Sequence, residues 1–143
     1  MLCRRGLVLV FLLAARLARC EASGQGAAPV DEIVGTWHGS SICVDRQAAP
    51  GCNDEQVVYE ISASGKPNTV TVKADKVVDG KRQSMGDLEF THDAKSGSWT
   101  TEFENPRVHA LWRLTVAGDA LRGTMVLLPS RAVARKMDLK KEK

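Results

Sequence analysis

Short stretches in which apolar and polar residues alternate fill the chain from Ile33 onward. The alternation is clearest between residues 107 and 117, where one face carries Val108, Ala110, Trp112, Leu114 and Val116. A period of two residues indicates β-strands that bury one face and expose the other. No stretch predicts a long helix. We predict eight strands, at residues 33–43, 57–63, 69–78, 83–92, 98–104, 107–117, 120–128 and 132–139.

Turn residues separate these predicted strands and set how neighbours pair. Asp79-Gly80 suits a type I′ hairpin, and Gly118-Asp119 suits a similarly tight turn. Parallel neighbours need a crossover of a dozen or more residues, and most of the connections here are far shorter. We therefore predict an all-β fold in which eight antiparallel strands run up and down and close into a barrel, because closure hides both sheet edges. A two-sheet sandwich is the alternative.

The N-terminus has the pattern of a signal peptide. Arg4 and Arg5 precede the apolar run Leu7–Ala15, which as a helix would span only about half of a membrane's hydrocarbon core. Cleavage after Ala22 would leave a short, glycine-rich lead-in. We predict three parts: a signal peptide at 1–22, a flexible segment at 23–30 and a single β-barrel domain at 31–143.

A second interpretation of the N-terminus is a lipid attachment site at Cys20. The stretch Leu17-Ala18-Arg19-Cys20 partly resembles a bacterial lipobox, although Arg19 stands where that motif has a small residue. Export to the periplasm or the medium is therefore the prediction, and a lipid anchor through Cys20 is the lesser alternative.

Composition and charge narrow the choice of function. The chain has 143 residues, of which 43% are hydrophobic and 26% charged, as in an ordinary globular domain. Its net charge of +3 lies in the predicted leader, because removal of residues 1–22 takes away four basic residues and one acidic residue and leaves the two signs balanced. We therefore expect no binding to nucleic acids.

Cys43 and Cys52 are the two cysteines of the predicted mature chain. In an exported protein such a pair indicates a disulfide that closes a short loop. The C-x8-C spacing without nearby histidines is a poor zinc site. Asp45, Asp54 and Glu55 leave a calcium site open as an alternative to a solvated acidic loop.

The chain lacks the usual signals of catalysis. His38, His92 and His109 fall on different predicted strands, which argues against a metal site. Neither a nucleophile elbow nor a phosphate-binding loop is present. We therefore expect a protein that is not an enzyme and that carries no cofactor and no metal.

Ile33-Val34-Gly35-Thr36-Trp37 opens the first predicted strand with a G-x-W motif. This motif resembles the one that opens the first strand of calycins, the superfamily of lipocalins, fatty-acid-binding proteins and avidin-like barrels. The resemblance implies structural roles for Gly35 and Trp37, with Trp37 across the closed end of the barrel and a basic residue of the last strand packed on it. From the position of the two strands, we expect that residue to be Arg135. An opposite register, with Arg135 in solvent, is the alternative.

The same topology places residues 44–54 at the open end of the barrel, where lipocalins carry a lid loop. Side chains on the inward faces near this end are candidates for contact with a ligand, although such rows also occur in filled cores. These candidate ligand-binding residues are Tyr59, Met85, Phe103, Trp112 and Met125.

The sequence thus predicts an exported, lipocalin-like barrel that binds a small apolar or amphipathic ligand in its interior. One alternative is a protein-binding module that resembles the bacterial metalloprotease inhibitors, with residues 23–30 as the arm that enters a protease. Another is a structural protein or lipoprotein of the cell envelope. The sequence leaves the oligomeric state and the ligand open.

Overall fold

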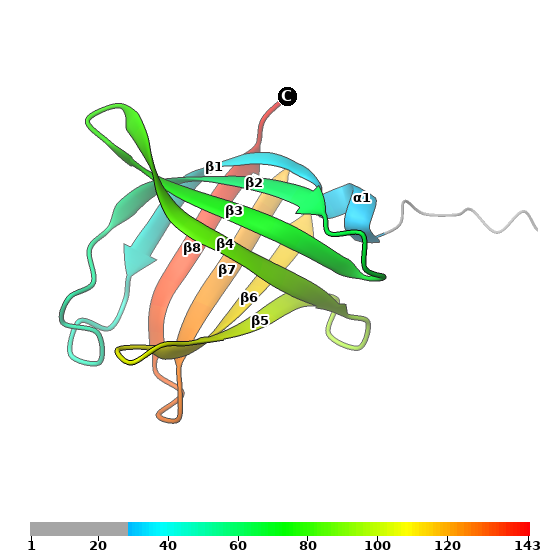
Figure 1. The fold of residues 1–143 in the computed structure, drawn as a ribbon. Coiled ribbons are helices and arrows are strands. Elements are labelled where there is room, and N and C mark those ends of the chain that lie inside the picture. The colour runs from blue at the N-terminus through cyan, green and yellow to red at the C-terminus, as the bar shows by residue number, and fades with distance from the viewer. Residues whose placement is uncertain (1–28) are drawn as a thin grey trace, which may run out of the picture.

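The computed structural model describes residues 29–143 and shows a closed barrel of eight strands (Figure 1). Each strand pairs antiparallel with the next, and β1 pairs with β8 to close the barrel. The predicted fold class is confirmed. The elements are α1 (Pro29–Ile33), β1 (Gly35–Cys43), β2 (Glu55–Ala63), β3 (Thr69–Val78), β4 (Lys81–Asp93), β5 (Ser98–Glu104), β6 (His109–Ala117), β7 (Ala120–Leu127) and β8 (Val133–Lys141).

The short helix α1 corrects the prediction for the start of the domain. Residues 29 and 30 were expected in a flexible segment and Ile33 in a strand, but all three belong to α1. Proline fits the first turn of a helix, and the Val34 N–H donates to the Val30 carbonyl at 3.0 Å. Ile33 is fully buried in the core, so tertiary packing outweighs the strand-like pattern around it.

The core includes a group of buried side chains around Trp37. Trp37, Leu121 and Leu139 are almost completely buried there, together with Ile33 from α1. The Trp37 indole N–H donates to the Ile33 carbonyl at 2.8 Å, which ties the helix to the first strand. The barrel is therefore closed at the end where α1 lies.

The wall of the barrel is least continuous between β4 and β5. Only residues 91–93 of β4 pair with residues 98–100 of β5. Residues 81–90 of β4, apart from Met85, pair with β3, and residues 101–104 of β5 pair with β6, but these two stretches do not pair with each other. The two strands thus diverge toward the end opposite α1.

A β-bulge bends β4 close to this gap. The register with β3 shifts between Ala74 and Asp75, so that Met85 has no partner on β3. The neighbouring Gly86 has a φ of 120°, which glycine tolerates better than other residues. Beyond the bulge, the β3–β4 hairpin curls away from the body of the barrel (Figure 1).

Several predictions fall outside the described residues. They are the signal peptide at 1–22, the lipid anchor at Cys20 and most of the segment 23–30. Within residues 29–143, no helix has the length and apolar character needed to cross a membrane.

Candidate ligand-binding site

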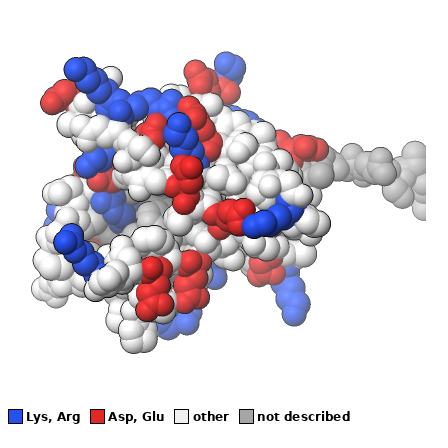
Figure 2. Space-filling view, in the orientation of Figure 1, with Lys and Arg blue, Asp and Glu red and all other residues white. Residues whose placement is uncertain are grey.

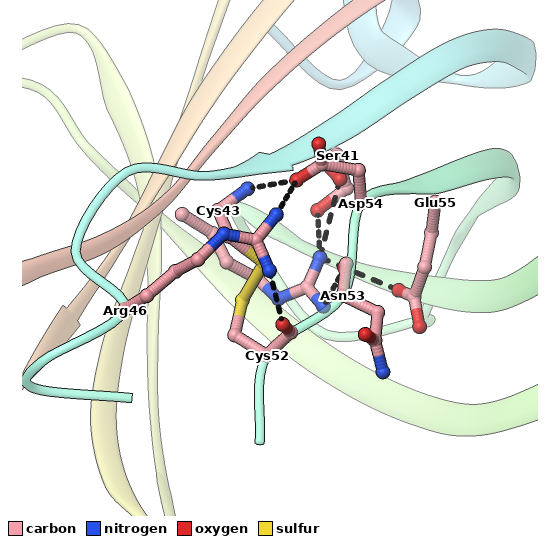
Figure 3. A network of polar contacts seen from close by, with 8 residues as sticks. Ser41, Cys43, Arg46, Cys52, Asn53, Asp54 and Glu55 are labelled. Atoms are coloured by element: carbon pink, nitrogen blue, oxygen red, sulfur yellow. Dashed lines mark hydrogen bonds and ion pairs between the residues drawn. A yellow bond between two sulfur atoms is a disulfide. The ribbon is translucent and has the colours of Figure 1, made fainter. Parts of the chain in front are cut away.

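The loop between β1 and β2 lies at the end of the barrel opposite α1 and is held by the Cys43–Cys52 disulfide (Figure 3). This confirms the predicted disulfide. The Asp54 carboxylate accepts hydrogen bonds from the Cys43 N–H at 2.8 Å and from Arg46 at 3.2 Å. Arg46 also donates to the Cys52 carbonyl at 2.9 Å. These contacts fold the loop onto itself.

The acidic side chains of this loop are engaged within the loop. Asp45 accepts hydrogen bonds from the N–H groups of Gln47 and Ala48, as in an Asx turn. Asp54 is paired with Arg46. Across residues 29–143, no group of three or more His, Cys, Asp or Glu side chains is arranged to hold a metal ion.

Arg135 anchors the loop to the barrel. Its guanidinium donates to the Ser41 hydroxyl at 2.7 Å and to the Asn53 carbonyl at 2.7 Å. It also forms an ion pair with Glu55 at 3.4 Å, and both side chains are largely buried. Arg135 therefore joins β8, β1 and the end of the loop at the mouth of the barrel.

This position of Arg135 corrects the prediction that it packs on Trp37. The cation over the Trp37 ring is Lys141, whose Nζ lies 5.2 Å from the ring centroid and donates to the Glu32 carbonyl at 2.9 Å. In the register of β1 and β8, Trp37 pairs with Lys141 and Cys43 pairs with Arg135. The last strand ends at Lys141 rather than at residue 139. The predicted position of Arg135 along the barrel, next to Trp37, was therefore wrong.

A cavity of about 230 Å³ lies inside the barrel on the side of β2 to β6. Its wall is mostly aliphatic and aromatic, and five neighbouring strands supply it, with a run of consecutive residues from β4 beside the bulge. The residues that line the cavity are Tyr59, Val72, Ala74, Met85, Gly86, Asp87, Leu88, Phe90, Phe103, Trp112 and Leu114.

Four of the five candidate ligand-binding residues border this cavity. Tyr59, Phe103 and Trp112 belong to its wall, and Met85 stands at its rim with 43% of its surface exposed. Met125 does not border it. It lies on β7 next to Trp112, and β7 supplies no residue to the lining. Whether the other four contact a ligand stays a prediction.

Most of the lining residues that β3 and β4 supply were not among the residues predicted from the sequence. Val72, Ala74, Leu88 and Phe90 lie on the inward faces of these strands. Their alternation with polar residues was visible in the sequence. An inward position alone does not show whether a side chain borders a void or packs against a neighbour, because that depends on the opposite wall of the barrel.

Tyr59 brings a hydroxyl to this apolar wall. Its side chain is almost completely buried, at 4% exposure. Burial raises the pKa of Tyr59 to about 12, while the charge of Arg135 acts to lower the pKa and that of Glu55 to raise it. Tyr59 is therefore a neutral phenol over the whole physiological range of pH.

The outer surface carries both signs of charge. In the face that Figure 2 shows, basic and acidic side chains are interspersed and form no large area of one sign. Ion pairs on the described surface include Lys66 with Glu89 at 2.7 Å and Arg82 with Glu60 at 2.8 Å. This face does not have the continuous positive area typical of nucleic-acid-binding surfaces.

No protein-family model matches this sequence, and a comparison with curated proteins finds no match. Among solved structures, the fold is similar to that of the siderocalin Ex-FABP, described as functioning through dual ligand specificities. The TM-score is 0.50 at 11% identity, over 81% of this chain and 75% of that one. At this identity the likeness concerns the fold alone. The closed antiparallel barrel, with Trp37 buried at one end, and this likeness show that the chain has a lipocalin-like fold.

Proposed function

We propose that the protein is an exported binding protein that holds a small apolar or amphipathic molecule inside its barrel. The observation that carries this proposal is the cavity, which has a largely apolar wall and lies beside the gap between β4 and β5. Ligand sites in proteins are typically concave and mostly apolar, with a few polar groups that fix orientation. The similar siderocalin is also described as a ligand-binding protein.

The size of the cavity limits the ligand. At about 230 Å³, it lies below the range of most drug-sized sites, so a compact molecule with two or three rings fits better than a long acyl chain. Burial of the ligand's apolar surface would supply most of the affinity.

Two features support export. Arg4 and Arg5 followed by Leu7–Ala15 form a leader-like segment at the N-terminus. The Cys43–Cys52 disulfide suits an oxidising compartment such as the periplasm or the extracellular medium.

The cavity can be tested with an uncharged fluorescent probe, N-phenyl-1-naphthylamine. Ala74 is half-buried and its side chain borders the cavity, so Ala74→Phe would fill the space that the probe needs. We expect the probe to bind the wild-type protein with enhanced fluorescence. Its Kd should rise at least about tenfold in Ala74→Phe, because steric overlap between the added phenyl ring and the probe should weaken the binding free energy by about 1.4 kcal/mol or more.

The matched control is Ala94→Phe, which makes the same change in the exposed turn between β4 and β5. This variant should bind the probe like the wild type. Unchanged binding in Ala74→Phe, with the fold retained by circular dichroism, would show that the probe binds elsewhere and would contradict the proposed site.

The protein-binding alternative depends on residues 23–30. The structure describes only Pro29 and Val30 of that segment, and both lie in α1. No contact in residues 29–143 favours that alternative over binding in the cavity.

A further inference from the structure

The Tyr59 hydroxyl is the only hydroxyl group among the residues that line the cavity. The other neutral hydrogen-bonding side chain in the wall is Trp112, whose indole N–H donates and does not accept. The remaining inward side chains are aliphatic, phenyl or thioether groups. A ligand in this cavity thus meets neutral donors on an otherwise apolar surface.

No group in residues 29–143 forms a hydrogen bond with the Tyr59 hydroxyl. The pKa of Tyr59 is set by burial and by the charges of Arg135 and Glu55, with no hydrogen bond contributing. Within residues 29–143, Asp75 Oδ1 is the only fully buried polar side-chain atom that lacks a partner, so the Tyr59 oxygen keeps some accessible surface. Tyr59 lines the cavity, which is where a ligand could reach this oxygen. An accessible hydroxyl is hydrated in the empty cavity, so a ligand that displaces this water keeps the hydrogen bond only if it brings an acceptor.

The charged groups near Tyr59 neutralise each other. Arg135 and Glu55 form an ion pair at 3.4 Å, and Arg135 also binds Ser41 and Asn53. Asp87, the remaining charged lining residue, is exposed and pairs with Lys73 in the β3–β4 ladder. The cavity therefore offers no uncompensated positive charge to an anion, and transfer of an unpaired charge into an apolar site is unfavourable.

We infer that the ligand is an uncharged, compact molecule with an acceptor oxygen, such as a ketone or an ether, that takes a hydrogen bond from Tyr59. This inference rests on the proposed function, because it names the chemical class that the same cavity accepts. The raised pKa of Tyr59 keeps the donated proton in place at physiological pH.

Three planar probes of nearly equal shape separate the parts of this inference. They are 2-acetylnaphthalene, a neutral ketone; 2-isopropenylnaphthalene, in which a methylene group replaces the carbonyl oxygen; and 2-naphthoate, an anion. Each is measured by displacement of N-phenyl-1-naphthylamine from the wild type and from Tyr59→Phe. This variant removes only the hydroxyl, and because that group has no protein partner, the variant should fold and melt like the wild type.

We expect Tyr59→Phe to weaken binding of the ketone about three- to tenfold, the range for one neutral hydrogen bond, and to leave binding of the alkene within about twofold. Naphthoate should bind the wild type at least about a hundredfold more weakly than the ketone. Equal losses for ketone and alkene would overturn the role of Tyr59, and tight binding of naphthoate would overturn the preference for neutral ligands. If N-phenyl-1-naphthylamine itself fails to bind the wild type, the proposed function is wrong, which distinguishes that failure from the other two.

Discussion

At the scale of single residues, burial determines the protonation state of Tyr59. Tyr59 sits in the wall of the cavity at 4% exposure, and its neutral form is favoured because the phenolate would lose its hydration. The nearby ion pair of Arg135 and Glu55 changes this little, since its two charges act on the pKa in opposite directions. The hydroxyl is therefore kept as a hydrogen-bond donor.

The pKa of Tyr59 can be measured without ambiguity because it is the only tyrosine in the chain. We expect tyrosinate absorbance to appear near pH 10 in concentrated guanidinium and only toward pH 12 in the folded protein. Above pH 10 the unfolded chain loses the proton that the native protein retains, so the free energy of unfolding should fall by up to about 1.4 kcal/mol per pH unit.

Tyr59→Phe is the control for this titration, because other groups also titrate in that range. The fall in stability between pH 10 and pH 12 should be smaller in the variant than in the wild type. Identical pH dependence in both proteins, or tyrosinate absorbance near pH 10 in the native state, would mean that Tyr59 is not buried as described.

At the scale of elements, two basic residues of β8 fix the two ends of the barrel. Lys141 covers Trp37 and binds the Glu32 carbonyl at the closed end. Arg135 binds Ser41, Asn53 and Glu55 at the open end. A single strand thus holds both α1 and the disulfide loop against β1.

Lys141→Ala should lower the free energy of unfolding by about 1–2 kcal/mol, since it removes one cation–π contact and one hydrogen bond to a carbonyl. Thermal or denaturant unfolding measures this loss. Lys143→Ala removes an equal charge from an exposed position two residues further on and should have little effect. Equal stabilities of the two variants would rule out a structural role for the Lys141 contact.

The comparison of β1 and β8 also shows what the sequence could predict. Alternation placed Trp37, Arg135 and Leu139 on inward faces, and the G-x-W motif marked the first strand. The register between β1 and β8 could not be predicted from the sequence, because it depends on the stagger with which the barrel closes. The predicted last strand ended at residue 139, although Lys141 continues the same inward alternation.

At the scale of the whole molecule, the interior is divided into a filled part and a hollow part. Trp37, Leu121 and Leu139 fill one region, whereas the cavity lies against β2 to β6. The hollow part adjoins the stretch in which β4 and β5 do not pair. No composition or periodicity predicts such a division, because it results from the fit of side chains that are distant in sequence.

The most direct test of binding inside the barrel is an NMR measurement on methyl-labelled protein with N-phenyl-1-naphthylamine. We predict intermolecular NOEs from the probe to the methyl groups of Val72, Leu88 and Leu114, which line the cavity. Ile42 and Val44, which are exposed apolar residues, should show none. NOEs to Ile42 and Val44 with none to the lining methyls would place the probe on the outer surface and contradict the account.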